Sequence, residues 1–271
     1  MGSTAANATR HPATRGAFVD AGVVAAIHPF YTAAIREFQA AGRTVVGSAP
    51  VGHNGTMGWL KSIGEAYGIA GEKIAAAQNA FGPAIKAALA ATPITGRITL
   101  SGYEGSELLV ARLLIESGAD VPYVGTACAR NDWSAADREW LEAKGVAVKF
   151  RASLEDDLAA MEGFKPDLAI GTTPVVQKAK AQGIPSLYFT NLISARPLMG
   201  PAGAGSLAQV VNAAIAGKTR MEGMKAFFAG VGEGDTAGIW EGSPNLRPDF
   251  RAIHQKKLDK AAKAAKPEEM I

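Results

Sequence analysis

The sequence of 271 residues contains a single cysteine, Cys128, and this scarcity excludes several kinds of site. One cysteine cannot form a disulfide within the chain, nor build a metal site whose ligands are all cysteines. A lone cysteine is more often a small buried hydrophobe than a ligand or a nucleophile. It also fits a reducing compartment.

Long apolar runs and a strong net charge are missing as well. The first twelve residues contain no apolar stretch, so we expect no signal peptide. No later segment offers the roughly 18 uninterrupted apolar residues that a membrane span needs. The net charge is only +3, and much of the basic excess lies beyond residue 255, so no nucleic-acid partner is expected. We therefore expect a cytoplasmic protein.

Glycine, in contrast, is abundant at 31 residues, and short apolar runs alternate with helical patterns almost from end to end. This alternation predicts an α/β fold with Rossmann-like parallel sheets and flanking helices. The expected strands are 23–27, 45–49, 97–100, 121–125, 146–150, 168–171 and 186–189. The expected helices are 31–41, 57–67, 72–91, 106–117, 134–143, 154–161, 175–181 and 206–216.

The elements group into a partial and a more complete domain. We divide the chain into an unassigned start, a partial Rossmann-like domain, a connecting helix, a Rossmann-like domain and a helical tail, at 1–20, 21–71, 72–91, 92–230 and 231–271. The first domain looks incomplete because two strands cannot bury both faces of a doubly wound layer. Pro83 is expected to kink the connecting helix or to begin a second segment. The tail carries a charged helix from about 248 to 265.

Two glycine-rich stretches invite a phosphate-binding interpretation. Residues 101–106, Ser-Gly-Tyr-Glu-Gly-Ser, lie between a strand and a helix, where backbone N–H groups can meet an anion. The Walker and dinucleotide patterns are incomplete there, so a structural turn is favoured over ligand contact, and NAD or ATP binding is not expected. Residues 200–205, Gly-Pro-Ala-Gly-Ala-Gly, are interpreted as a mobile or partner-facing loop.

Two histidines follow successive predicted strands. His28 and His53 are therefore expected at the carboxyl edge of one sheet, where open α/β sheets bind ligands. A neutral histidine there could donate a proton, line a pocket or bind a metal, whereas a loop histidine that merely bonds the backbone is commoner. Two histidines without a supporting carboxylate or thiolate do not make a zinc site, so no metal is assigned.

The helix at 134–143 has an amphipathic pattern. Asp137 and Glu142 are expected to flank its solvent-exposed face, and Trp140 and Leu141 to point inward or sideways.

Several long runs of the sequence resemble one protein family. They are residues 24–36, 98–107, 167–174, 188–200 and 232–241. Together these runs resemble the Y-type subunits of the chlorophyllide a reductases, within the nitrogenase-like family. The resemblance covers roughly residues 21–271, and runs of this length are far more specific than a short glycine pattern.

The resemblance implies an oxidoreductase subunit of bacteriochlorophyll biosynthesis. Y-type and Z-type subunits form a heterotetrameric catalytic component that holds a 4Fe–4S cluster between them. A separate reductase component, subunit X, uses ATP to deliver electrons, and the C7=C8 double bond of chlorophyllide a is reduced. Family subunits have three Rossmann-like domains, and the cluster cysteines of the Y type lie in the first.

The sequence is expected to lack the first domain of this pattern, and Cys128 falls in the last expected domain, so it cannot be carried over as a cluster ligand. Two of the three domains are expected, the first of them incomplete, and the chain alone is expected to be inactive. Its role would be to complete the substrate cavity and the interface to subunit Z. The candidate substrate contacts are His28, Tyr31, His53, Tyr103, Thr172, Asn191 and Arg196; no catalytic residue is assigned.

Two alternatives remain open at this stage. One is a subunit of a related nitrogenase-like reductase of the dark-operative protochlorophyllide type. The other is a Rossmann-type scaffold or binding module without redox activity.

Overall fold

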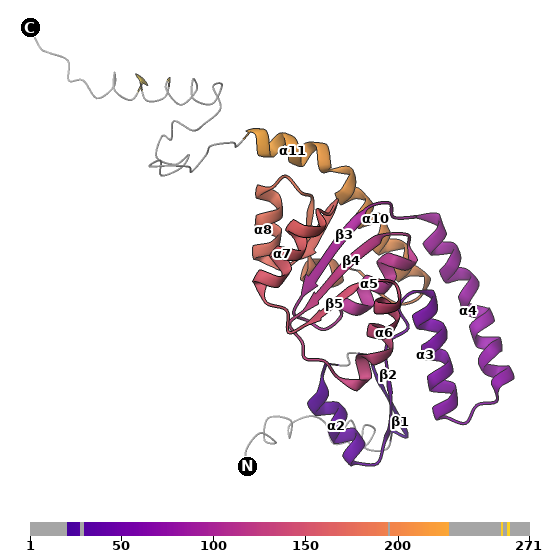
Figure 1. Ribbon diagram of the computed structural model, residues 1–271. Helices are drawn as coiled ribbons and strands as arrows, with labels where there is room; N and C mark the ends of the chain where they lie inside the picture. The colour runs from indigo at the N-terminus through magenta and orange to yellow at the C-terminus, as the bar shows by residue number, and fades with distance from the viewer. Residues whose placement is uncertain (1–20, 28–29, 195, 228–255, 257–258, 261–271) are drawn as a thin grey trace, which may run out of the picture.

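The computed structural model describes residues 21–27, 30–194, 196–227, 256 and 259–260 (Figure 1). The strands are β1 (Val23–Ala26), β2 (Thr44–Gly47), β3 (Arg97–Gly102), β4 (Asp120–Thr126), β5 (Ala147–Phe150), β6 (Leu168–Gly171) and β7 (Ser186–Tyr188). The first helices are α2 (Thr32–Ala40), α3 (Gly52–Ala66), α4 (Gly71–Ala91), α5 (Glu107–Glu116) and α6 (Ala135–Ala143), with a 3-10 turn η1 (Asp132–Ser134) before α6. The later helices are α7 (Leu154–Phe164), α8 (Thr173–Ala181), α9 (Phe189–Ser194), α10 (Gly200–Ala216) and α11 (Lys218–Phe227).

The strands form two separate parallel sheets. β1 and β2 make a small sheet of two strands, and the other five make a sheet in the order β5-β4-β3-β6-β7. Every strand pair in the two sheets is parallel. The order reverses between β3 and β6, as in doubly wound α/β folds. The predicted α/β class with parallel sheets and flanking helices is confirmed.

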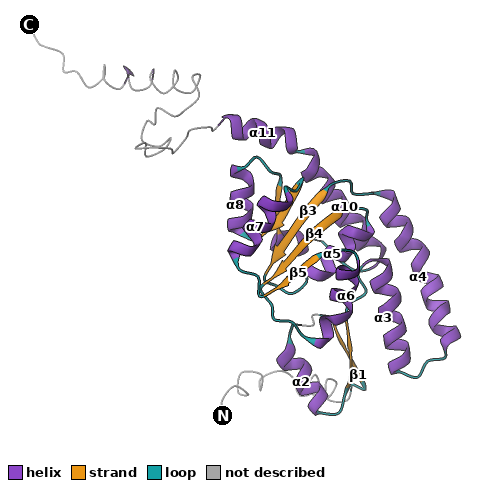
Figure 2. Ribbon diagram, in the orientation of Figure 1, coloured by secondary structure: helices purple, strands orange, loops and turns teal. Residues whose placement is uncertain are grey.

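Helices cover both faces of the large sheet, as Figure 2 shows. The larger core joins α5, α10 and α4 to β3, β4 and β6, and buries Leu113, Leu114 and Val211. A smaller core under α7 and α8 is centred on Met161, Val175 and Ala179. Strands that are buried on both faces read as continuous apolar runs, which is why β6 was predicted with its exact bounds.

The small sheet is joined to the large one by α3 and α4. α4 packs against both α3 and α10, and an isolated antiparallel bridge pairs Val51 with Met199. α4 is one helix from Gly71 to Ala91 with Pro83 inside it, so of the two expected outcomes Pro83 does not begin a second segment. No described helix is both long enough and apolar enough to cross a lipid bilayer.

The glycine-rich stretch 200–205 was predicted as a loop, and this is wrong. It forms the first turns of α10, with Pro201 at the start of the helix, where a missing N–H costs nothing. Gly203 allows the helix to pack closely, since a Cβ there would lie 2.3 Å from the carbonyl carbon of Leu198. The predicted tail helix at 248–265 lies outside the described residues except for 256, 259 and 260.

The solvent face predicted for Asp137 is also wrong. Asp137 is 1% exposed, because its carboxylate bonds the guanidinium of Arg112 on α5 and the hydroxyl of Ser48. Leu141 is fully buried as expected, and Glu142 is exposed.

Candidate functional site

The loop between β3 and α5 is organised by a buried carboxylate, Glu107. The backbone N–H groups of Glu104 and Gly105 each donate to it over 2.8 Å, and the Thr126 hydroxyl donates over 3.0 Å. Burial raises the pKa of Glu107, although these hydrogen bonds oppose the shift. The amides that could have held a phosphate are therefore occupied by a side chain of the same loop, and the favoured interpretation of a structural turn is supported.

The small sheet reaches the large one at this loop. Phe30, which follows β1, packs against Gly105, where a Cβ would lie 2.4 Å from the Phe30 ring. The Phe30 ring centroid is also 6.5 Å from that of Phe150 at the end of β5. Gly105 has a φ of +90°, so both its conformation and this contact favour glycine. Two aromatic rings thus connect the two parts of the chain at the carboxyl edge of the large sheet.

Two exposed tyrosines flank this aromatic contact. Tyr31 follows Phe30 and is 66% exposed, and Tyr103 lies in the β3–α5 loop and is 54% exposed. Thr172 follows β6, the neighbour of β3, and begins α8 at the same edge. The structure therefore brings Tyr31, Tyr103 and Thr172 of the predicted contacts to one edge of the large sheet.

Hydroxyl groups of the last strand and its helix support the same edge. The Thr190 hydroxyl donates to the carboxylate of Glu104 over 2.6 Å, and the hydroxyls of Thr173 and Tyr188 are hydrogen-bonded to one another. The first contact holds the Glu104–Gly105 turn against α9, and the second joins the start of α8 to the end of β7.

The remaining predicted contacts lie elsewhere. His28 is outside the described residues. His53 is in the first turn of α3, where its ring lies beside Gly82 of α4 and close to the Asn54 side chain. Asn191 and Arg196 line a separate groove beside β7 and α8. No described geometry unites all seven predicted residues in one site.

Cys128 lies just beyond β4, and its backbone N–H donates to the Thr126 hydroxyl over 3.2 Å. The side chain is partly buried, and no group of three or more His, Cys, Asp or Glu residues that could hold a metal is found in the described segments. Burial raises the pKa of the Cys128 thiol, the Thr126 hydroxyl opposes the shift, and the Glu107 carboxylate adds to it. A thiol in this setting is a poor nucleophile and a poor cluster ligand at neutral pH.

This setting makes the alkylation of Cys128 slow. We expect the rate of its reaction with iodoacetamide to rise with pH with a midpoint above that of an unperturbed thiol, because burial raises the pKa of Cys128. The same chain unfolded in urea should return to the ordinary midpoint. A folded-state midpoint at or below the unfolded one would contradict the burial described here.

A second buried carboxylate, that of Asp157, lies against the face of β4 opposite to Glu107. The Tyr123 hydroxyl donates to Asp157 over 2.8 Å, and Ser101 also bonds this carboxylate. Burial raises the pKa of Asp157 to about 6, although the Tyr123 and Ser101 hydroxyls oppose the shift. Burial and the nearby Asp157 charge raise the pKa of Tyr123 as well.

The raised pKa of Asp157 predicts a stability that falls with pH. An unfolded aspartate titrates near pH 4, so the folded chain holds an extra proton between about pH 4 and pH 6. The free energy of unfolding should be highest below this window and fall by on the order of 2–3 kcal/mol as the pH rises through about 6. Urea unfolding across this range should show a fall in Asp157→Asn that is smaller than the wild-type fall by this amount, because Glu107, whose pKa is also raised, is present in both proteins.

The adjacent carboxyl is a matched control for this prediction. Asp156 caps α7 by accepting from the Ser153 N–H, which lowers its pKa. Asp156→Asn should therefore keep the wild-type fall between pH 4 and 7. If the fall in Asp157→Asn is as large as in the wild type, the carboxyl at 157 is not the group that titrates.

Comparison with known proteins assigns the chain to a family. Residues 9–216 match the family model described as nitrogenase component 1 type oxidoreductase. The chain belongs to this family. It is 81% identical over 255 residues to the chlorophyllide reductase 52.5 kDa chain of Cereibacter sphaeroides, covering 94% of this chain and 51% of that protein. The same-named chain of Rhodobacter capsulatus is 75% identical over the same shares.

The chain spans about half the length of the curated relatives it matches. Among solved structures, it is similar to nitrogenase Cp1 at pH 6.5, with a TM-score of 0.47, 20% identity, and 66% of this chain and 41% of that chain covered. The resemblance to the nitrogenase-like family expected from the long runs is thus confirmed by the family match.

Sequence reasoning missed several residues at the carboxyl edge of the large sheet. Phe30, Glu107, Thr126 and Thr190 were not singled out, although all but Thr126 stand inside the runs that carried the family resemblance. A signal for Glu107 was its position directly after the turn, where a carboxylate can reach back to free backbone N–H groups.

Proposed function

We propose that this chain is part of the catalytic component of a chlorophyllide a reductase. The observation that carries this proposal is the 81% identity over 255 residues to a chain named chlorophyllide reductase. At this identity the core, the β3–α5 loop and the substrate-facing surfaces are expected to be shared. The reaction is the reduction of the C7=C8 double bond of chlorophyllide a in bacteriochlorophyll synthesis.

The proposed assembly needs partners beyond this chain. Subunit Z completes the heterotetrameric catalytic component, and subunit X, an ATP-dependent iron–sulfur reductase, delivers the electrons. ATP acts on subunit X, which fits the occupied amides of the loop at 101–106 in this chain. The two Rossmann-like parts, residues 21–71 and 92–230, are proposed as two of the three domains of the complete subunit.

The residues present do not fit a 4Fe–4S cluster. Such a cluster takes cysteine thiolates as ligands, and the one cysteine here is a partly buried thiol with a raised pKa, away from any group of further ligands among the described residues. We therefore place the cluster ligands in the remaining half of the subunit and in subunit Z.

Substrate contacts are proposed at the carboxyl edge of the large sheet. A chlorin is a large planar ring that needs a concave, mostly apolar surface with a few polar groups. Tyr31 and Tyr103 expose aromatic rings beside the Phe30 contact, and Thr172 adds a hydroxyl. The other proposed contacts are His28, which precedes Phe30 by two residues, and His53, Asn191 and Arg196.

The proposal can be tested in cells of Cereibacter sphaeroides. The matching half of the gene for its 52.5 kDa chain would be replaced by the sequence of this chain. We expect bacteriochlorophyll at close to the parental level, because four of five residues are unchanged. Accumulation of chlorophyllide a, with the hybrid chain present and assembled at normal abundance, would contradict the proposal.

A further inference from the structure

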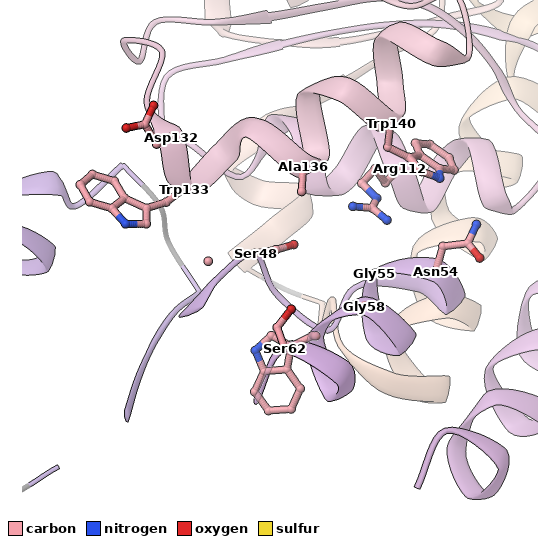
Figure 3. Close-up of a pocket in the computed structure, with 12 residues that line it drawn as sticks. Ser48, Asn54, Gly55, Gly58, Ser62, Arg112, Asp132, Trp133, Ala136 and Trp140 are labelled. Carbon is pink, nitrogen blue, oxygen red and sulfur yellow. The ribbon is translucent and has the colours of Figure 1, made fainter. Parts of the chain in front are cut away.

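α3 and α4 form a pair of packed helices joined by the short turn at 67–70, and only one of the two is enclosed by the fold. α3 is the inner helix, because its Gly55 faces Arg112 of α5 and Trp140 of α6 across a cavity of about 460 Å³ (Figure 3). α4 is the outer helix and packs against α3 and α10. The side of α4 that faces away from these two helices is exposed.

This exposed side of α4 carries no charge along most of its length. The helix buries Gly82, Ile85 and Leu89, and a row of exposed residues repeats every three or four positions on the opposite side. We call this row the outer face of α4; its members are Ala76, Ala80, Pro83, Ala84, Ala87 and Ala91. Lys86, the one charged residue between positions 76 and 91, lies about 100° around the helix from Ala87. Surface helices normally place charged and polar residues on the side that faces away from the core.

Large apolar side chains are exposed on the same pair of helices. Tyr67 and Ile69 in the connecting turn are 59% and 44% exposed, and Phe81 of α4 is 54% exposed. They are three of the eight large apolar side chains exposed in the described part of the chain. Alanine is the best helix former, so helix propensity alone could explain a row of alanines, but it does not explain these three. Exposed apolar surface of this extent is typical of a protein–protein interface.

The position of the helix pair in the fold indicates what covers it. Helices cover both faces of the large sheet, whereas the small sheet has only two strands, which are marginal by themselves. Figure 1 shows α3 and α4 extending past the large sheet toward the end of the molecule where the small sheet lies, and α3 contacts β2. This end therefore combines an incomplete sheet with an exposed apolar helix.

The lengths of the relatives supply a polypeptide of matching size. The chain covers 51% of each of the two chlorophyllide reductase chains, so about half of each relative lies outside the match. That other half has to pack against the half that this chain matches. The incomplete end with α4 offers it the apolar surface that such packing needs.

We propose that the outer face of α4 docks the other half of the same subunit, through an apolar helix of that half. Small side chains let a partner helix approach closely, because the distance between two helix axes depends on the side chains at the contact. The row from Ala76 to Ala91 is roughly 22 Å long, which is about four turns of a partner helix. The inference rests on the family membership and the chain lengths, and it does not depend on the proposed reaction.

Co-expression of the two halves tests this surface without any need for turnover. This chain would carry an affinity tag, and the other half would be the unmatched part of the Cereibacter sphaeroides 52.5 kDa chain. We expect the two halves to co-purify in equal amounts. Ala80→Glu combined with Ala84→Glu places two charges in the apolar contact and should weaken the association about a hundredfold or more. Glutamate is a good helix former, so the Tm of this chain alone should not change.

Ala159 provides a matched control. It is an exposed alanine of α7, a helix that covers the large sheet. Ala159→Glu should leave the association of the two halves unchanged. Wild-type halves that do not associate, or an association that survives the two glutamates on α4, would overturn the proposal.

Cysteine labelling identifies the partner in the intact subunit. The Ala80→Cys variant should be alkylated by iodoacetamide in this chain alone and at least about tenfold more slowly in the hybrid 52.5 kDa chain before subunit Z is added. Ala159→Cys should react equally in both, and peptide mass spectrometry separates each site from Cys128. Protection of Ala80→Cys that appears only with subunit Z, or in a self-associated form of this chain, would overturn the proposal and assign the outer face of α4 to that partner.

Discussion

Replacing Asp137 by alanine is expected to cost about 3–5 kcal/mol of unfolding free energy, the usual result of leaving a buried charge without its partner. The Asp137 carboxylate is 1% exposed and bonds both the Arg112 guanidinium and the Ser48 hydroxyl, the latter over 3.1 Å. The substitution leaves the positive charge of Arg112 buried without a partner. It also releases Ser48, which connects the small sheet to α6. Urea unfolding at pH 7 would measure the change.

Glu139 is a matched control on the same helix. Its carboxylate lies 3.0 Å from Arg138 but its side chain is 66% exposed, so Glu139→Ala should change the unfolding free energy by no more than about 1 kcal/mol. The double variant Arg112→Met with Asp137→Leu should recover much of the loss, because it removes both charges. An Asp137→Ala variant as stable as Glu139→Ala would show that the buried ion pair is not made.

Replacing Glu107 by glutamine is expected to cost about 2–5 kcal/mol and to loosen the β3–α5 loop. The carboxylate accepts from the N–H groups of Glu104 and Gly105 and from the Thr126 hydroxyl. Glutamine offers one oxygen, and its NH₂ group would face a donor, so one or two buried donors lose their acceptor at about 1–3 kcal/mol each. Amide hydrogen exchange of Glu104 and Gly105 would locate the loss.

Glu104→Gln supplies the comparison for this prediction. The Glu104 carboxylate accepts one hydrogen bond, from the Thr190 hydroxyl, and an amide oxygen can still accept it. We therefore expect a change below about 1 kcal/mol. Equal losses in the two glutamine variants would mean that Glu107 does not organise the loop.

Local pattern was enough to predict most elements of the large sheet. The five strands carry short apolar stretches, continuous in β6, and the helices between them have turns at their ends, so each was placed within a few residues. The beginning of α3 at Gly52 was missed because it depends on a distant group. The Glu116 carboxylate accepts from the backbone N–H groups of His53 and Asn54, 63 and 62 residues away in the sequence. Capping by a remote side chain leaves no local signal.

The error at Asp137 originates in tertiary packing. A charged residue on an amphipathic helix is normally solvated, and here Arg112 of α5 and Ser48 supply the partners that make burial of Asp137 favourable. Neither partner can be identified from the local sequence. At 200–205, glycines weaken a helix by themselves, yet α10 forms there, packed against α4, with Gly203 allowing its first turn to lie close to the backbone of Leu198.

The candidate substrate contacts also divide into positions that strand ends predict and positions that only helix packing determines. Strand ends place Tyr103 and Thr172 at one edge, because β3 and β6 are neighbours in a parallel sheet. The turn of His53 toward α4 follows from the packing of α3 on α4, which periodicity does not reveal.

The most direct measurement is the turnover of a purified complex. The hybrid 52.5 kDa chain, with this sequence in its matching half, would be assembled with subunit Z and supplied with reduced subunit X and ATP. We expect chlorophyllide a to lose its C7=C8 double bond at a rate close to that of the parent complex, and protochlorophyllide to remain unreduced. An assembled, cluster-loaded complex that leaves chlorophyllide a unchanged, or reduces protochlorophyllide in its place, would contradict the proposed function.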